Sequence, residues 1–280
     1  GTGTLPVLAE NLWPMSRGMS MQAMSTYTYR TPHFQLSGAQ DYPKCHWGTQ
    51  TQMWLATLDR DAYVFTTYPA QLGLAGPDLT FAGDWIGGYS PRATFVRDVG
   101  ILQYRPPDNE AVSDFLSADI THAFFPKTRF DEVVEDGPWL FGRKGDGYLA
   151  LASQNPAYWS DENDFEWVAP GNENVWIIQM GSSEEFADFD AFIDAVTAAE
   201  LSFETSVYYA SPTAGVLEVG WDGPLTVDGV EADLGPYERF DSEHIRQPLG
   251  SPQAVVSLDD RVLVLDFHRA TRRLFQVADE

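Results

Sequence analysis

The sequence predicts an all-β protein, a large antiparallel β-sandwich with one or two packed helices. Short runs rich in aromatic and β-branched residues recur along its 280 residues, and Gly, Pro and Asp separate them. A chain of this length can bury roughly 75% of the surface that its unfolded form exposes, which allows a sizeable core. Cys45 is the single cysteine, so no intramolecular disulfide contributes to the fold.

The segment 124–153, FFPKTRFDEVVEDGPWLFGRKGDGYLALAS, has the clearest strand pattern. Apolar and acidic residues mix over 130–135, Asp136-Gly137-Pro138 interrupts the run, and an apolar run resumes over 139–141. Three glycines between Gly142 and Gly147 then predict a polar turn before the run 148–152. We therefore expect three consecutive antiparallel strands here.

The segments before this one predict an entry into the same sheet structure. Residues 1–24 contain four of the methionines without a clear period, and we interpret these side chains as adaptable packing. From Ser25 onward the pattern predicts strands, a Gly-rich surface loop over 72–90 and a short connecting helix over 108–116. The strands expected in this part cover residues 25–30, 53–58, 63–67 and 93–104, the last as one long strand or a pair.

The clearest helix covers residues 182–199. Ser182 or Ser183 can cap it, and an apolar face repeats at three- and four-residue steps through Phe186, Phe189, Ile193 and Val196. An acidic aromatic loop over 158–167 precedes it. Further strands are predicted over residues 174–180, 207–209, 216–219, 225–227, 254–258, 262–267 and 274–277.

No internal repeat or low-complexity linker divides the chain. We therefore expect an irregular N-terminal segment over residues 1–24, followed by a single β-sandwich domain over residues 25–280.

The charge is strongly acidic, with 41 Asp and Glu against 17 Lys and Arg and a net charge of -24. A nucleic-acid partner is disfavoured, because a phosphate backbone needs basic groups that this surface lacks. A high-salt environment would screen the repulsion, since the Debye length at molar salt is about 3 Å. A GC-rich genome that favours Asp, Glu, Arg and Ala explains the composition equally well.

No apolar run approaches the roughly 20 residues of a membrane span, and residues 1–10 lack the regions of a signal peptide. We expect a soluble protein without a membrane partner, either in a high-salt cytoplasm or secreted. The first residues, GTGTL, are typical of a processed terminus.

The sequences FPKTRFDEVVEDGPWLFGRKGDGYLAL and YTYRTPHFQLSGAQDY resemble the β-sandwich half of heparinase II/III-like polysaccharide-active proteins. In those proteins a helical toroid precedes a large antiparallel sandwich and carries most catalytic residues. The resemblance implies the β-sandwich part of a polysaccharide lyase-like enzyme that acts on a uronic-acid-containing glycan. It also implies a missing N-terminal helical domain or a partner chain. The alternative is a noncatalytic structural, assembly or carbohydrate-binding module.

Elimination on a uronic-acid polymer needs a base for the proton beside the carboxylate and a group that neutralises that carboxylate. The segment 30–54 supplies both types of group. We expect His33, Tyr42 and His46 as catalytic residues, with Arg30, Gln52 and Trp54 as substrate-binding residues. The alternative is that these side chains are merely exposed or hydrogen-bonded within an ordinary β-protein.

A second candidate set of substrate-binding residues comprises Arg129, Trp139 and Arg143. Guanidinium groups grip carboxylates bidentately, and a Trp ring can stack on a sugar. We expect Arg30, Arg129 and Arg143 to form an electropositive patch beside Trp54 or Trp139. The alternative is that Arg129 forms a surface ion pair with Asp131 or Glu132, worth under about 1 kcal/mol.

No cofactor and no metal site is expected. The five histidines lack metal-binding spacings, and one cysteine cannot build a thiolate site. Asp161, Asn163, Asp164 and Glu166 resemble a calcium loop only loosely, and a solvated acidic loop is the better interpretation.

Overall fold

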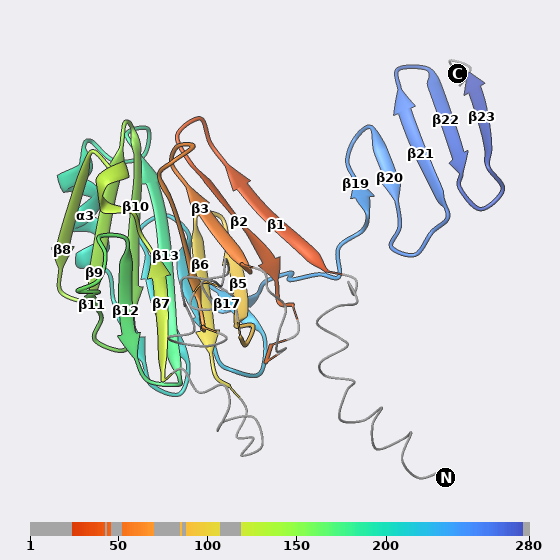
Figure 1. Ribbon diagram of the computed structural model, residues 1–280. Helices are drawn as coiled ribbons and strands as arrows, with labels where there is room; N and C mark the ends of the chain where they lie inside the picture. Colours follow the sequence, from red (N-terminus) through yellow and green to blue (C-terminus); the bar gives the residue numbers. More distant parts are fainter. Residues whose placement is uncertain are drawn as a thin grey trace, which may run out of the picture. The chain divides into compact units, whose positions relative to one another are not determined.

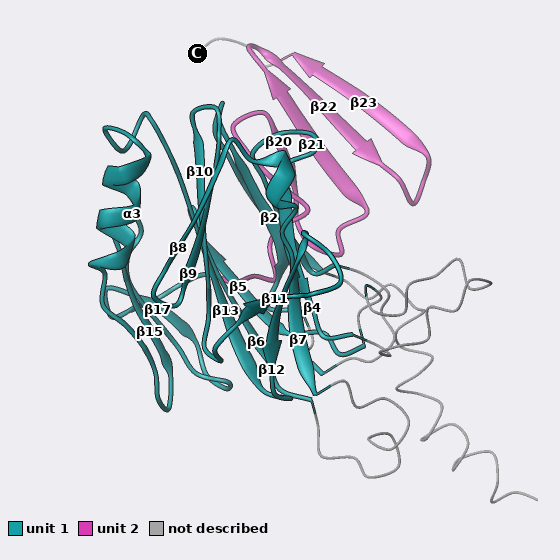
Figure 2. Ribbon diagram, turned by 60° about the vertical axis from the view of Figure 1, so that its left-hand side comes forward, with its two compact units in different colours: residues 1–233 teal, residues 234–280 magenta. Residues whose placement is uncertain are grey.

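The computed structural model describes residues 24–42, 44–45, 52–69, 85, 88–106 and 119–276. These residues form four antiparallel sheets and one α-helix (Figure 1). The chain divides into two compact units, residues 1–233 and 234–280, each described separately below (Figure 2). No composition shift or linker in the sequence marks a boundary near Leu234, and the expected single domain stays a prediction.

Two sheets of the first unit form the predicted sandwich. The first has the strand order β1 (Ser25–Arg30), β2 (Gln35–Gln40), β3 (Trp54–Thr57), β4 (Tyr63–Thr67), β7 (Ile120–Phe124), β12 (Glu166–Pro170) and β11 (Tyr158–Trp159). The second has the order β5 (Arg92–Val96), β6 (Val99–Tyr104), β13 (Asn174–Ser182), β10 (Gly147–Ser153), β9 (Trp139–Lys144) and β8 (Glu132–Asp136).

The main core lies between these two sheets. Alternate residues of the first sheet, such as Leu36 and Val64, pack in one buried cluster with Phe95 and Trp176 of the second. Gly38 of β2 lies directly against the ring of Phe95, so a Cβ at this position would overlap the ring. This close approach fixes how the two sheets pack. The prediction of an all-β sandwich is confirmed.

A third layer covers the other face of the second sheet (Figure 2). It consists of the helix α3 (Phe189–Thr197) and a five-stranded sheet with the order β14 (Leu201–Phe203), β15 (Val207–Ser211), β16 (Gly215–Val219), β17 (Leu225–Val227) and β18 (Val230–Glu231).

 Aromatic contacts join this layer to β9 of the second sheet. The ring centroids of Phe141 and Phe192 lie 6.0 Å apart, and those of Trp139 and Tyr209 lie 5.7 Å apart. Outside this layer, the short 3-10 turn η2 (Lys127–Arg129) precedes β8.

The helix α3 begins later than the sequence predicts. Ser182 is the last residue of β13, where it pairs with Gly147 of β10, so neither it nor Ser183 caps the helix. Asp188 is the N-cap instead, because its Oδ1 accepts a hydrogen bond from the backbone N–H of Ala191 at 2.8 Å. The buried helical residues are Phe189, Phe192 and Val196.

The central segment forms three antiparallel strands as predicted, β8, β9 and β10. The turn between β9 and β10 is shorter than expected and consists of Gly145, whose φ is +56°, and Asp146. Gly142 lies inside β9, where a Cβ would come within 2.7 Å of the Phe130 ring. It is therefore a packing glycine and not a turn glycine.

The second unit is a five-stranded antiparallel sheet in chain order. Its strands are β19 (Phe240–Asp241), β20 (Ile245–Gln247), β21 (Gln253–Leu258), β22 (Arg261–Asp266) and β23 (Thr271–Gln276). The turn at Asp259 and Asp260 joins β21 to β22 as predicted, with φ at Asp259 in the left-handed region.

Three sequence-based expectations lie wholly or mostly outside the described residues: the irregular segment 1–24 except Met24, the helix over 108–116 and most of the loop over 72–90. The other strand predictions are confirmed. In particular, residues 93–104 form the pair β5 and β6 rather than one long strand.

Candidate functional site

The expected catalytic residues do not come together among the described residues. His33 precedes β2 and Tyr42 follows it, so the length of a six-residue strand, roughly 20 Å, separates them. Nε2 of His33 lies 3.3 Å from Oε1 of Glu184. His46 lies outside the described residues. Their catalytic roles stay predictions, without a common site to support them.

The expected substrate-binding residues of the same segment divide into exposed and buried side chains. Arg30 and Gln52 are exposed. Trp54 is only 1% exposed, and its Nε1 donates a hydrogen bond to Oγ1 of Thr66 at 2.9 Å. Trp54 belongs to the core between the sheets, so the substrate-binding role expected of it stays a prediction without an accessible ring to support it.

The second candidate set also separates. Trp139 is 3% exposed and packs against Phe141 and Tyr209, so it too presents no ring to a sugar. Nη2 of Arg143 lies 3.2 Å from Oε2 of Glu132. The expected arginine patch beside Trp54 or Trp139 is therefore corrected, because neither indole reaches the surface.

The ion pair of Arg129 with Asp131 or Glu132 does not form, because both carboxylates have other partners. Asp131 pairs with Lys144 at 2.8 Å, and Glu132 pairs with Arg143. Arg129 itself is exposed in η2 and forms no ion pair within 4.0 Å with a described residue.

A different group of side chains gathers on the first sheet, on the face that points away from the second sheet. Phe65 pairs with Phe124 in the register of β4 and β7, and Thr67 pairs with His122. Their neighbours in sequence, including Val64 and Ala123, face the core. Since side chains alternate along a strand, these four residues project from the outer face.

Aromatic rings make this outer face continuous. We define the outer-face cluster as Tyr63, Phe65, Trp85, His122, Phe124 and Phe165. Neighbouring ring centroids lie 5.3 Å apart for Phe65 and Phe124, 5.5 Å for Trp85 and Phe124, and 5.6 Å for Phe124 and Phe165. Tyr63, Trp85, Phe124 and Phe165 are each partly exposed.

The indole of Trp85 lies flat on the imidazole of His122, with centroids 4.0 Å apart and an interplanar angle of 9°. It meets Phe65 and Phe124 edge-on. Among the described residues, no second ring stacks in parallel on Trp85. One face of the indole is thus supported by the sheet, and the other is not taken by a described aromatic ring.

Hydrogen bonds hold the imidazole in place beneath this indole. Nδ1 of His122 lies 2.7 Å from Oε1 of Glu166, and Nε2 lies 2.7 Å from Oγ1 of Thr67. Asn163 donates to the other carboxylate oxygen of Glu166 at 2.9 Å. The hydrogen bond from His122 holds the pKa of Glu166 below its ordinary value. Glu166 is therefore a carboxylate at neutral pH, and Nδ1 of His122 carries the proton that it accepts.

Thr67, His122 and Glu166 stand in the order of a nucleophile, a base and the carboxylate that orients the base. The exposed fractions of Thr67 and His122 are 3% and 0%. A substrate bond cannot approach the Thr67 hydroxyl in this arrangement, so we assign the three residues to support of the outer-face cluster. No role for His122 was predicted from the sequence, because both faces of β7 carry apolar residues and alternation alone does not show which face meets the core.

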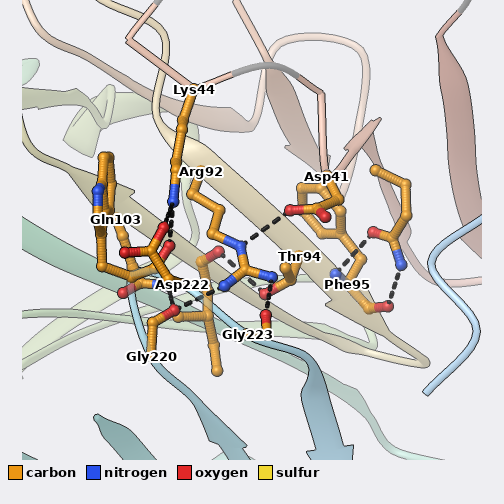
Figure 3. Close-up of polar contacts among 12 residues, drawn as sticks. Asp41, Lys44, Arg92, Thr94, Phe95, Gln103, Gly220, Asp222 and Gly223 are labelled. Atoms are coloured by element: carbon orange, nitrogen blue, oxygen red, sulfur yellow. Dashed lines mark hydrogen bonds and ion pairs between the residues drawn. The ribbon is translucent and has the colours of Figure 1, made fainter. Parts of the chain in front are cut away.

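A second polar cluster has a structural role. The guanidinium of Arg92, a residue only 4% exposed, donates to Oδ1 of Asp41 at 2.9 Å and to the carbonyl oxygens of Gly220 and Gly223 at 2.7 and 2.6 Å (Figure 3). Nζ of Lys44 lies 2.6 Å from Oδ1 of Asp222 in the same turn. The bonds of Arg92 join the turn after β16 to β5 of the second sheet. They also give the buried guanidinium the partners that its charge requires.

Within the described part of the chain, no three His, Cys, Asp or Glu residues lie close enough together to hold a metal ion. No helix in that part is long and apolar enough to cross a membrane.

No protein-family model and no curated protein sequence matches this chain. The resemblance to heparinase II/III-like proteins therefore stays a prediction, and the function is argued from the site alone.

Proposed function

We propose that this protein binds carbohydrate through the outer-face cluster. The observation that carries the proposal is Trp85, a partly exposed indole that is held flat on the buried imidazole of His122. A ring supported in this way loses little conformational freedom when a ligand packs on it, which favours binding. The neighbouring Phe124 and Phe165 extend the apolar surface around it.

The polar groups beside the rings suit a ligand with hydroxyl groups. Glu166 bonds to His122, and Asn163 bonds to Glu166; both residues are partly exposed and carry groups that can form further hydrogen bonds. Small-molecule sites commonly combine aromatic surface with a few such polar groups. Glu166 is the only acidic or basic side chain in this group, apart from the imidazole, so a neutral saccharide fits it better than a polyanion.

The lyase activity implied by the resemblance is not part of this proposal. A lyase needs a base and a carboxylate-binding group at the same place. His33 and Tyr42 lie at opposite ends of β2, and the described arginines of the candidate sets do not lie in the cluster. We accordingly favour the noncatalytic carbohydrate-binding alternative.

A binding screen with single-residue variants tests the proposal. The purified full chain is titrated by isothermal calorimetry with neutral hexasaccharides of glucose, mannose and xylose, and with oligouronates of the same length. We expect saturable binding to at least one neutral series. Trp85→Ala should weaken it at least about tenfold, which corresponds to about 1.4 kcal/mol.

Tyr158→Ala is the matched control, because Tyr158 is an exposed aromatic residue on β11 of the same sheet but outside the cluster. It should leave the affinity unchanged within about twofold. Absence of binding to every saccharide, or equal losses for Trp85→Ala and Tyr158→Ala, would sink the proposal.

A further inference from the structure

The second unit is much less acidic than the rest of the chain, and its basic residues are arginines. Residues 234–280 contain six arginines and eight Asp or Glu residues, whereas the whole chain has a net charge of -24. Three of these arginines, Arg269, Arg272 and Arg273, lie within five residues around the start of β23. These three positive charges make the electrostatic potential around them less repulsive to an anion than the potential of the acidic remainder of the chain.

A hollow of about 190 Å³ opens on one face of this sheet. Its lining includes Arg269, Arg273, Val264, Thr271 and Phe275. The register explains why they meet, because Arg273 lies opposite Val264 in the pairing of β22 with β23. These two strands are neighbours in the sheet of the second unit (Figure 1). Arg272 is the preceding residue on the same strand, so its side chain projects from the opposite face.

The acidic residue in the hollow is already satisfied. Oδ2 of Asp266 accepts a hydrogen bond from Nε2 of Gln253 at 3.0 Å, and Oδ1 accepts one from the backbone N–H of Arg269 at 2.9 Å. The bond from Gln253, then the bond from Arg269 and the positive charge of its side chain, hold the pKa of Asp266 below its ordinary value.

The two arginines of the hollow are not committed to ion pairs. Within the second unit, Arg246 lies 3.7 Å from Asp241 and Arg261 lies 4.0 Å from Asp260. Arg269 and Arg273 form no ion pair within 4.0 Å with any residue that the structure describes, and both are exposed. Their guanidinium groups remain able to donate to a ligand.

We infer that this hollow binds a carboxylate attached to a ring. Guanidinium groups match the geometry of a carboxylate and donate paired hydrogen bonds to it. Arg269 and Arg273 supply these donors, and Phe275 with Val264 supplies apolar surface for the ring. The inference rests on the second unit alone, so it does not depend on the carbohydrate-binding proposal for the outer-face cluster.

Nuclear magnetic resonance of the 15N-labelled full chain tests the inference. The protein is titrated at constant ionic strength with sodium benzoate and, separately, with sodium glucuronate, which carry the same anionic group on an aromatic and a saccharide ring. We expect saturable shifts of the amide signals of β21, β22 and β23 with at least one of them. Benzyl alcohol and glucose, the neutral counterparts, should cause none.

Variants separate the hollow from a general effect of positive charge. Arg273→Gln and Arg269→Gln should each weaken binding at least about fivefold, since each removes a charged donor. Arg272→Gln removes the same charge from the opposite face and should change the affinity less than about twofold. No saturable shift with either anion, equal binding of the neutral counterparts, or an equal loss with Arg272→Gln would overturn the inference.

Discussion

His122 and Glu166 come from the neighbouring strands β7 and β12, and Nδ1 of the one lies 2.7 Å from Oε1 of the other. The imidazole is fully buried, so Glu166 supplies the partner that water cannot. Because Trp85 lies on this imidazole, the pair also fixes the platform on which the proposed function depends.

Glu166→Gln should therefore destabilise the protein. A hydrogen bond to a charged group contributes about 1.5–3 kcal/mol, and we expect a loss in that range at neutral pH. The pKa of Glu166 is lowered in the folded state, so its contribution is present above the ordinary value of 4.5 and disappears as pH falls through the folded pKa. Urea denaturation at several pH values measures both effects.

Glu135→Gln is the matched control for this variant. Oε1 of Glu135 accepts a hydrogen bond from Nε1 of Trp159 at 2.6 Å, but Glu135 is exposed. Its loss should cost less than about 1 kcal/mol. If the two variants are equally destabilised, the buried imidazole does not depend on Glu166.

Asp98 should give the opposite dependence on pH. It is fully buried, and its Oδ1 has no hydrogen-bond partner among the described residues, while Oδ2 accepts from Thr213 at 2.5 Å and from Gln179 at 3.0 Å. Burial raises the pKa of Asp98. Its contribution to stability is thus full below the ordinary value of 3.8 and is lost as pH rises through the folded pKa.

Asp98→Asn removes this titration. We expect the free energy of unfolding of the variant to improve relative to that of the natural sequence as pH rises from about 4 to 7. Denaturation by urea at four pH values across this range is the measurement. A difference between the two proteins that stays constant with pH would show that Asp98 is ionised throughout.

Arg92→Met should destabilise the first unit by about 1.5–3 kcal/mol, because it removes the buried charged donor that Asp41, Gly220 and Gly223 share. Arg105→Met is the comparison, since Arg105 forms an exposed ion pair with Glu173 that is worth under about 1 kcal/mol. Chemical denaturation of both variants measures the two losses in the free energy of unfolding. Similar losses would contradict the structural role of Arg92.

Gly38→Ala tests the packing of the two sheets. The new Cβ would overlap the Phe95 ring, and such overpacking typically costs about 1–3 kcal/mol. In a Phe95→Leu background the same substitution should cost less, because the smaller side chain leaves room for the methyl group. Thermal denaturation of the four proteins in this cycle gives the coupling; strictly additive losses would contradict the contact.

The fold was predictable because alternation and turn chemistry are local. The residues Asp259 and Asp260 between two β-branched runs predict the hairpin that β21 and β22 form. The start of α3 was less predictable. Ser182 and Asp188 are both good N-caps, and only the pairing of Ser182 with Gly147 in the sheet decides between them.

The candidate site was not predictable, because it depends on which face of each strand meets the core. Aromatic side chains alone do not decide this: Trp54 and Trp139 are buried, whereas Phe124 is partly exposed. In β4 and β7 both faces carry apolar residues, so alternation gives no direction. The pairing of His122 with Glu166 joins residues 44 positions apart and follows only from the order of the strands.

The most direct test of the central claim is to locate a bound saccharide on the full chain. Amide chemical shifts of the 15N-labelled protein are followed during titration with the neutral hexasaccharide that binds most tightly. The proposed function predicts that the largest shifts fall in β4, β7 and β12 and at Trp85. Largest shifts in the second unit or in the second sheet, or no saturable shift at all, would contradict it.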